Sequence, residues 1–179
     1  MNAETTPPHL LAFLAEHDVD HEIVAPGVPM PTVPDAAAAI GVGVEQILKT
    51  LLFDDRNGGF IVAIACGTGR VDRARLAAAA GAGKLRVADA ADVLRVTGYP
   101  AGGVAPLALP HDLTVVVDSA VVNLPAAWGG AGREELLMRI CPADIVRLNN
   151  ATVAEIVTPG CGAPTGPQTS PSPIMADCA

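Results

Sequence analysis

A run dense in glycine and proline, between residues 98 and 106, is the feature that most constrains how this chain can fold. The sequence Gly-Tyr-Pro at 98–100 is followed at once by Gly-Gly-Val-Ala-Pro at 102–106, with apolar segments on both sides. Glycines bring main-chain N–H and C=O groups within reach of a ligand because no Cβ stands in the way, and prolines stiffen the chain around them. The run therefore predicts a rigid loop with exposed main chain between two buried elements.

The composition fits one domain whose core is built from small and branched side chains. The chain has 179 residues, of which 50% are apolar but only 3% aromatic. Its apolar runs are too short to span a bilayer, and the N-terminus lacks the pattern of a signal peptide, so we expect a cytoplasmic protein. We predict a domain over residues 1–157. Residues 158–179 are rich in Pro, Gly and Ser, which predicts a disordered tail.

Helix start and stop signals predict five helices. Thr6 with Pro7 at the first helical position opens the first, which should run to about residue 18, and Asp35 caps an alanine-rich second helix that ends at Gly41 or Gly43. The region 26–34 before it is too rich in proline for a helix or a strand. The remaining helices are predicted at 72–80, 89–97 and 142–148.

Short apolar runs between these helices predict strands. Residues 54–59, which are acidic, Asn and Gly residues between two apolar runs, indicate a hairpin. Strands are expected at 21–24, 49–53, 60–65, 85–87, 113–117, 121–122, 126–128, 136–140 and 153–157. Because helices and strands alternate without a regular βαβ period, we expect an α+β domain with a mixed or largely antiparallel sheet.

The charge is unevenly distributed along the chain. The formal net charge is −8, yet residues 49–95 carry eight of the eleven basic residues and only five of the nineteen acidic ones. A net negative charge disfavours nucleic acid, whose phosphates are contacted by Lys and Arg, whereas the basic window permits such a contact locally. A solvated helix face explains the window equally well.

No residue pattern predicts a metal ion or a cofactor. The four cysteines form no CxxC pair and have no histidine at zinc spacing. The turn Gly-Thr-Gly-Arg at 67–70 lacks both common phosphate-loop motifs. Lys49 is the exception among the basic residues, because it opens a strand that should pack in the core. Such a lysine either extends its ammonium group to water or is held for a ligand.

The segment Lys49-Thr50-Leu51, followed by residues 97–106, resembles the YbaK/EbsC family, whose domain is also the editing (insertion) domain of bacterial prolyl-tRNA synthetases. The resemblance extends over about residues 20–157 and includes the segments 32–42, 70–77, 128–132 and 142–145. It implies a compact single α+β domain with a mixed, mostly antiparallel, barrel-like sheet surrounded by helices. It also implies hydrolysis, in trans, of the ester that joins a wrong amino acid to tRNA.

The resemblance carries roles for individual residues. It places Lys49 in the substrate pocket, holding the aminoacyl-adenosine end, with Thr50 beside it. The loop 102–106 corresponds to the family's GxxxP loop, whose main chain positions the ester and the terminal ribose. The implied catalytic residues are Lys49, Gly102 and Gly103, and the implied substrate-binding residues are Thr50, Val104, Ala105, Pro106, Thr32 and Met30. Glu134 and Glu135 depart from the family pattern, which has small or basic residues at that edge of the pocket.

These residues include no evident nucleophile or general-base histidine, so we expect water to attack, assisted by the main chain of the loop and by the ribose hydroxyl of the substrate. Substrates would be tRNAs carrying alanine, cysteine or serine. The partners would be the acceptor end of aminoacyl-tRNA and, as a second candidate, an aminoacyl-tRNA synthetase. Two alternatives stay open: a non-catalytic module that binds an aminoacyl or nucleotide-like ligand, and a small-molecule ester hydrolase.

Overall fold

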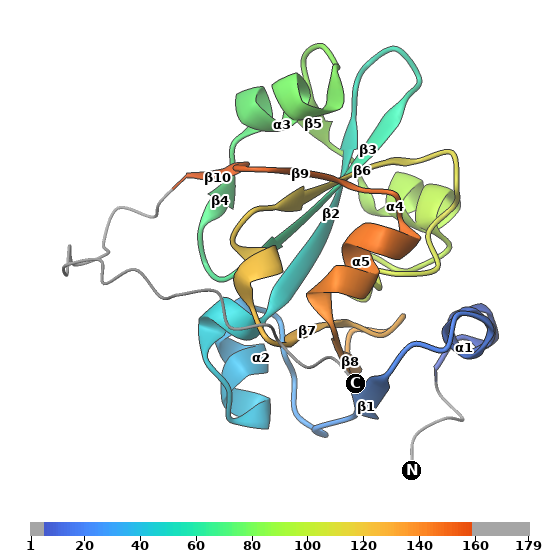
Figure 1. Ribbon diagram of the computed structural model, residues 1–179, viewed down its shortest axis with the longest axis vertical. Helices are drawn as coiled ribbons and strands as arrows, with labels where there is room; N and C mark the ends of the chain where they lie inside the picture. The colour runs from blue at the N-terminus through green and yellow to red at the C-terminus, as the bar shows by residue number, and fades with distance from the viewer. Residues whose placement is uncertain (1–5, 159–179) are drawn as a thin grey trace, which may run out of the picture.

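The computed structural model describes residues 6–158, which form five α-helices and two short 3₁₀ helices around three β-sheets (Figure 1). The predicted tail lies outside the described residues, apart from Thr158, which belongs to the last strand. None of the helices in this part of the chain is both long enough and apolar enough to cross a bilayer. The helices are α1 (Pro8–Glu16), α2 (Val33–Ile40), η1 (Val44–Gln46), α3 (Arg73–Ala80), α4 (Ala90–Thr97), η2 (Val121–Asn123) and α5 (Pro142–Leu148).

A five-stranded sheet forms the centre of the fold, with strand order β5-β2-β3-β6-β9. A three-stranded sheet, β1-β8-β7, and the pair β10-β4 complete the structure. The strands are β1 (His21–Val24), β2 (Leu48–Asp54), β3 (Phe60–Cys66), β4 (Arg70–Val71), β5 (Arg86–Val87), β6 (Thr114–Asp118), β7 (Ala127–Gly130), β8 (Leu137–Ile140), β9 (Thr152–Ala154) and β10 (Val157–Thr158).

The strand pairing confirms the predicted α+β domain with a mixed, mostly antiparallel sheet. The predicted hairpin is present, because β2 pairs with β3 in antiparallel register over its whole length, from Leu48 opposite Cys66 to Asp54 opposite Phe60. Only the pairs β3–β6 and β6–β9 are parallel among the described strands. A single parallel bridge between Ile47 and Trp128 joins the central sheet to the three-stranded one. The described strands curve into a barrel-like arrangement without closing it.

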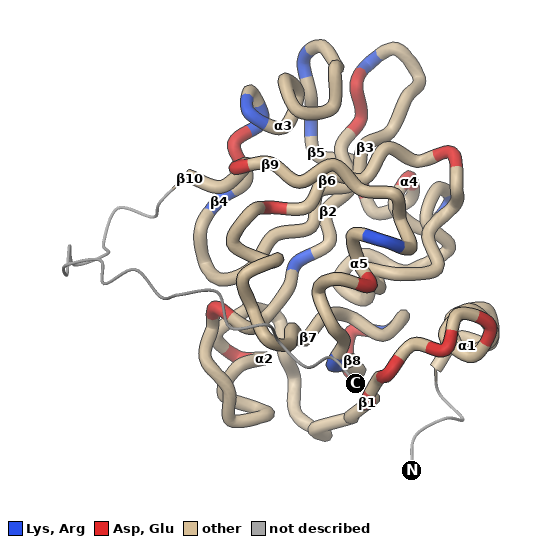
Figure 2. Tube along the Cα trace, viewed as in Figure 1, with Lys and Arg blue, Asp and Glu red and all other residues tan. Residues whose placement is uncertain are grey.

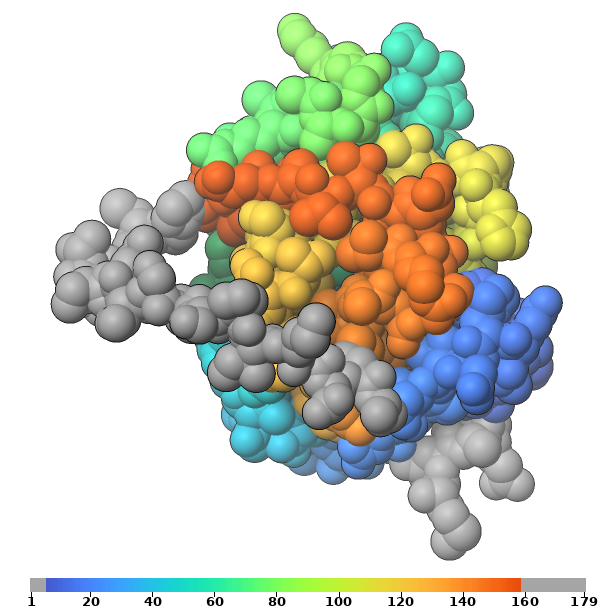
Figure 3. Space-filling view, in the orientation of Figure 1, coloured from blue at the N-terminus to red at the C-terminus, as the bar shows by residue number. Residues whose placement is uncertain are grey.

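Helices cover the central sheet on both faces, and side-chain alternation along the strands divides the core accordingly. Val62 and Ile64 of β3 belong to the larger apolar cluster, with α1 and the glycine-rich loop. Their neighbours Ile61 and Ala63 belong to a second cluster under α3. In the space-filling view, β9 and α5 (orange) cross the front of the molecule between α3 above and α1 and α2 below (Figure 3).

Tyr99 anchors the glycine-rich loop in the larger core cluster. Its side chain is fully buried, and its hydroxyl donates a hydrogen bond to the carbonyl oxygen of Leu107 at 3.1 Å. Burial raises the pKa of Tyr99, so the hydroxyl keeps its proton and its role as a donor. This bond spans the loop from its beginning to its end, and it explains how a segment so rich in glycine holds one conformation.

Two predicted helix starts are wrong by a few residues. α1 has Pro7 rather than Thr6 at its N-cap, with Pro8 as its first residue. α2 begins at Val33, inside the segment predicted to be a loop, and its N-cap is Thr32 rather than Asp35. The hydroxyl of Thr32 accepts a hydrogen bond from the N–H of Asp35. Pro34 is tolerated because the first turn of a helix needs no N–H partner inside the helix.

Two of the strand predictions also need correction, and one strand was missed. Residues 121–122, expected to be a strand, form the 3₁₀ helix η2. The strand expected at 153–157 is divided into β9 and β10, because Asp118 Oδ2 accepts hydrogen bonds from the N–H of Ile156, between the two strands, and from that of Val157, at the start of β10. The short strand β4 was not predicted, since a two-residue strand has no periodicity of its own.

The basic window is not a uniformly basic surface. Figure 2 shows its Lys and Arg residues around α3, β5 and the β2–β3 hairpin, with acidic residues among them. Arg75, Arg86 and Arg95 make ion pairs with Glu155, Asp54 and Asp92. The solvated-face interpretation therefore fits the window better than a continuous phosphate-binding surface.

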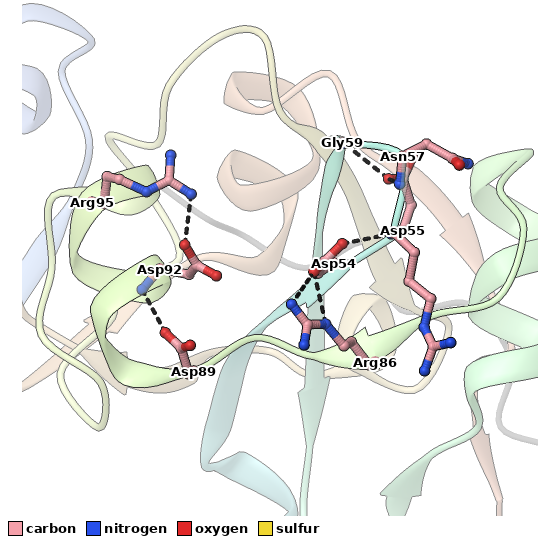
Figure 4. A network of polar contacts seen from close by, with 9 residues as sticks. Asp54, Asp55, Asn57, Gly59, Arg86, Asp89, Asp92 and Arg95 are labelled. Atoms are coloured by element: carbon pink, nitrogen blue, oxygen red, sulfur yellow. Dashed lines mark hydrogen bonds and ion pairs between the residues drawn. The ribbon is translucent and has the colours of Figure 1, made fainter.

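Asp54 fastens the end of the β2–β3 hairpin to β5 (Figure 4). Its carboxylate accepts a hydrogen bond from the main-chain N–H of Arg56 and pairs with the Arg86 guanidinium at 2.6 Å. These two contacts, led by the main-chain hydrogen bond, hold the pKa of Asp54 below its ordinary value. The ionised form is therefore favoured in the folded state.

We expect Asp54→Asn to lower the melting temperature at neutral pH and to reduce the sensitivity of the fold to acid. A carboxylate whose pKa is depressed in the folded state contributes stability above its unfolded pKa of about 3.9, and this stability is lost as the pH falls through the folded value. Melting curves of the parent and the variant between about pH 7 and pH 2 should therefore converge on acidification. The exposed Asp112, changed to Asn, is the control. Parallel curves for parent and Asp54→Asn would contradict this role.

Candidate active site

A cavity of about 260 Å³ lies between β2, the start of α2 and the glycine-rich loop. It opens into a wider groove of about 730 Å³, with which it shares Met30, Pro31, Gly102 and Glu134. The cavity is lined by Met30, Pro31, Thr32, Val33, Ala36, Ile47, Leu48, Lys49, Thr50, Leu51, Gly102, Val104, Gly130, Glu134, Leu136 and Leu137. Six of the nine predicted site residues are in this lining, from three segments far apart in the sequence.

The cavity faces an open edge of β2. β3 pairs with one edge along its whole length, whereas β5 reaches only Phe53 and Asp54 on the other edge. The carbonyl of Leu52 accepts a hydrogen bond from Ala88 on that second edge. Main-chain groups alternate between the two edges of a strand, so the N–H and C=O of Thr50 point to the same edge as those of Leu52. No described strand pairs there with Thr50, and its main chain therefore faces the cavity.

The side chain of Thr50 adds a hydroxyl without a partner. Within residues 6–158, Thr50 Oγ1 is the single buried side-chain oxygen or nitrogen that makes no hydrogen bond. Leaving a buried hydroxyl unpaired costs about 1–3 kcal/mol, and such a group requires an explanation. Because Thr50 lines the cavity, a ligand bound there would supply the missing partner. This is the strongest local indication of a binding site in the described structure.

Lys49 also lines the cavity, and its ammonium group is anchored inside the protein. Nζ donates hydrogen bonds to the carbonyl of Gly67 at 2.9 Å and to that of Gly69. Burial lowers the pKa of Lys49, while its interactions with the nearby Cys66 and Asp118 oppose this shift. A lysine ammonium has three donors, of which these two carbonyls use two. The side chain thus neither extends freely to water nor is kept wholly for a ligand.

The two glycines that were predicted to be catalytic have different surroundings. Gly102 lines both the cavity and the groove, with a φ of +88° that side-chain-bearing residues rarely adopt. Gly103 lines neither. Its N–H donates to the carbonyl of Pro100 at 3.0 Å, and its own carbonyl accepts from the N–H of Gly132 at 2.8 Å. Gly103 therefore joins the loop to the segment after β7, and its N–H already has a partner within the loop.

The rest of the predicted loop divides in the same way. Val104 lines the cavity, but Ala105 and Pro106 do not. Ala105 is fully buried in the larger core cluster. The ring of Pro106 packs against Gly129, and its carbonyl accepts a hydrogen bond from Asn149 Nδ2 at 2.8 Å. Ala105 and Pro106 therefore pack behind the loop, and their role as substrate contacts stays a prediction.

Met30 and Thr32 line the cavity, and their role in binding the amino acid stays a prediction. The Thr32 hydroxyl is already used in capping α2, so its contribution to a ligand would be mainly steric. The predicted site set omitted ten residues of the lining, among them Glu134, Gly130 and Leu136. Glu134 did give a signal in the sequence, as an acidic residue that departs from the family pattern.

Comparisons with known proteins agree with this geometry. A family profile described as an aminoacyl-tRNA editing domain matches residues 28–148. EbsC of Enterococcus faecalis, a candidate Cys-tRNA(Pro)/Cys-tRNA(Cys) deacylase, is 28% identical over 122 residues, which cover 68% of this chain and 74% of that protein. A proline–tRNA ligase of Pelobacter propionicus is 26% identical over 107 residues, 60% of this chain but only 19% of the ligase.

Among solved structures, the crystal structure of a candidate trans-editing enzyme for prolyl-tRNA synthetase superposes with a TM-score of 0.73 at 26% identity. The match covers 87% of this chain and all of the other. The profile match spans the cavity from Met30 to Leu137 and includes the glycine-rich loop. This chain belongs to the aminoacyl-tRNA editing domain family.

Proposed function

We propose that this protein is an aminoacyl-tRNA deacylase that acts in trans on tRNA carrying a small amino acid such as alanine, cysteine or serine. The observation that carries the proposal is the unpaired Thr50 hydroxyl in a cavity that also contains Lys49 and the glycine-rich loop. A cavity of about 260 Å³ suits a small aminoacyl group, and the adjoining groove leaves room for the terminal nucleoside.

The proposed reaction is the hydrolysis of an ester. A water oxygen bonds to the carbonyl carbon, the bond from that carbon to the ribose oxygen breaks, and the ribose oxygen leaves with a proton as a hydroxyl group. The products are the free amino acid and uncharged tRNA. The neighbouring ribose hydroxyl of the substrate assists the proton transfers, since the cavity lining holds no histidine.

The protein contributes mainly position and fixed dipoles. The main chain of Gly102 and the open edge of β2 at Thr50 flank the cavity from two sides and orient the ester between them. Preorganised donors aimed at a developing oxyanion each contribute about 3 kcal/mol or more to acyl transfer. Lys49 holds the ribose or phosphate end with its remaining donor, while its bonds to Gly67 and Gly69 fix the direction of the ammonium group.

Deacylation of alanyl-, cysteinyl- and seryl-tRNA by the parent protein tests this function. We expect at least one of the three to be hydrolysed well above the rate without protein, and the reaction to slow as salt rises because tRNA phosphates are bound electrostatically. Binding of aminoacyl-tRNA without hydrolysis would indicate the non-catalytic module. Hydrolysis of simple esters, insensitive to salt and without action on tRNA, would indicate the small-molecule hydrolase.

Thr50→Val should reduce deacylation without reducing the stability of the protein. The substitution replaces the unpaired hydroxyl by a methyl group of similar size. The free energy of unfolding should therefore stay the same or rise by up to about 1 kcal/mol, and the melting temperature should not fall. Deacylation should fall about fivefold to tenfold, because a hydrogen bond to the substrate is worth about 1–1.5 kcal/mol. Thr152→Val, at an exposed position of β9 outside the cavity lining, is the control. Full activity in Thr50→Val would exclude the hydroxyl as a substrate contact.

A further inference from the structure

The carboxylate of Glu134 lies at the junction between the cavity and its outer groove, and it lines both. It faces the glycine-rich loop: a Cβ built on Gly102 would lie 3.1 Å from both Cγ and Oε1 of Glu134. Gly102 therefore leaves the space that this side chain occupies. The contact puts an acidic group beside the main chain that the proposed reaction uses to orient the ester.

The charges around Glu134 leave its carboxylate available to a ligand. The neighbouring Glu135 forms an ion pair with Arg133 at 3.6 Å and lines only the groove. Lys49, the one cation in the cavity lining, is bound to the carbonyls of Gly67 and Gly69. Within residues 6–158, no ion pair or hydrogen bond is found for the Glu134 side chain. The mouth of the cavity is therefore locally acidic.

If the mouth of the cavity bound only phosphate groups, an acidic side chain there would be unexpected, because it would repel them. An aminoacyl ester, however, carries one cation of its own. Esterification removes the charge of the carboxyl group and leaves a free α-amino group, whose pKa lies near 8 or below, so that a substantial fraction is protonated at neutral pH. A carboxylate one side chain away from the ester-binding loop matches that ammonium group in charge and in position.

We propose that Glu134 binds the α-ammonium group of the aminoacyl ester and so selects free aminoacyl-tRNA over tRNA whose amino acid is blocked at nitrogen, as in N-acylated or peptidyl-tRNA. The inference rests on the proposed function and names a specificity residue of the same site. Glu134 is a positioning residue here, since it touches the amino group and not the reacting carbonyl.

The test compares alanyl-tRNA with N-acetylalanyl-tRNA for the parent, Glu134→Gln and Glu135→Gln. The readout is the ratio of kcat/KM for the free substrate to that for the blocked substrate. Glu134→Gln should lower this ratio about fivefold, which corresponds to about 1 kcal/mol, the upper value for a solvent-accessible ion pair. Glu135→Gln removes the same charge one residue away and should keep the parental ratio.

An unchanged ratio in Glu134→Gln would overturn the inference, because it would show that the carboxylate does not recognise the amine. If both substrates also react faster by the same factor, Glu134 acts only by repelling tRNA phosphates.

Binding measurements keep this test separate from the proposed function. The probes are the alanyl amide of 3′-amino-3′-deoxyadenosine, which cannot be hydrolysed as an ester, and its N-acetyl derivative. Glu134→Gln should weaken binding of the free amine about fivefold and leave binding of the acetylated probe unchanged. A parent protein that hydrolyses none of the charged tRNAs would refute the deacylase. Equal affinity of parent and Glu134→Gln for the free-amine probe would refute the role of Glu134 alone.

Discussion

Gly103→Ala is expected to lower deacylation by about a hundredfold or more and to destabilise the protein by about 1–3 kcal/mol. A Cβ at this position would lie 2.6 Å from the main-chain carbon of Arg133 and 2.7 Å from its Cα, so the loop or the segment after β7 must move. That movement would break the 2.8 Å hydrogen bond between Gly132 N–H and Gly103 C=O. Because the same loop presents Gly102 and Val104 to the cavity, a shift of about 1 Å suffices for the loss of rate.

Gly83→Ala is the matched control for this substitution. A Cβ at Gly83 meets nothing within 4 Å, and its φ lies outside the left-handed region. The control should therefore keep the parental rate, with a stability equal to the parent's or slightly higher. Deacylation rates and melting curves of the three proteins distinguish the outcomes. A Gly103→Ala protein with parental activity would show that the close approach of the loop to Arg133 is not needed for the reaction.

Lys49→Ala is expected to reduce deacylation by about two orders of magnitude with little loss of stability. The substitution removes the only cation of the cavity lining and releases the carbonyls of Gly67 and Gly69. Burial already disfavours the charged form of this side chain in the folded state, so its removal relieves a desolvation cost that offsets the lost hydrogen bonds. The measurement is kcat/KM on charged tRNA together with a melting curve.

Lys84→Ala provides the control, since Lys84 is the other lysine of the chain and is exposed. We expect it to behave like the parent in both measurements. Loss of activity in Lys49→Ala accompanied by a collapse of the melting transition would assign Lys49 to the fold alone. Parental activity in a folded Lys49→Ala protein would refute its role in positioning the substrate.

Local signals in the sequence were sufficient for much of the fold. The Asp and Gly residues between two apolar runs predicted the β2–β3 hairpin, and Asp72 and Asp89 cap α3 and α4 as expected. These features depend on residues within a few positions of one another, so propensity and capping rules apply. The two-residue strand β4 could not be predicted, since it forms by pairing Val71 with Val157, which is far away in the sequence.

The sequence predicted several residues of the cavity lining but not how their main-chain groups are oriented. The family resemblance located the lysine, the threonine and the glycine-rich loop, and the structure brings Lys49, Thr50 and Gly102 to one cavity. It could not show that Gly103 turns its main chain away from that cavity, because this depends on contacts with residues 132 and 133. The open edge of β2 could not be predicted either, because it depends on where β5 stops pairing with β2.

A crystal structure of the protein with the alanyl amide of 3′-amino-3′-deoxyadenosine would test the central claim most directly. We predict that the alanyl group occupies the cavity between β2 and the glycine-rich loop, with a polar atom within hydrogen-bonding distance of Thr50 Oγ1 and the adenosine in the adjoining groove. A ligand bound elsewhere, with Thr50 Oγ1 still unpaired, would contradict the account.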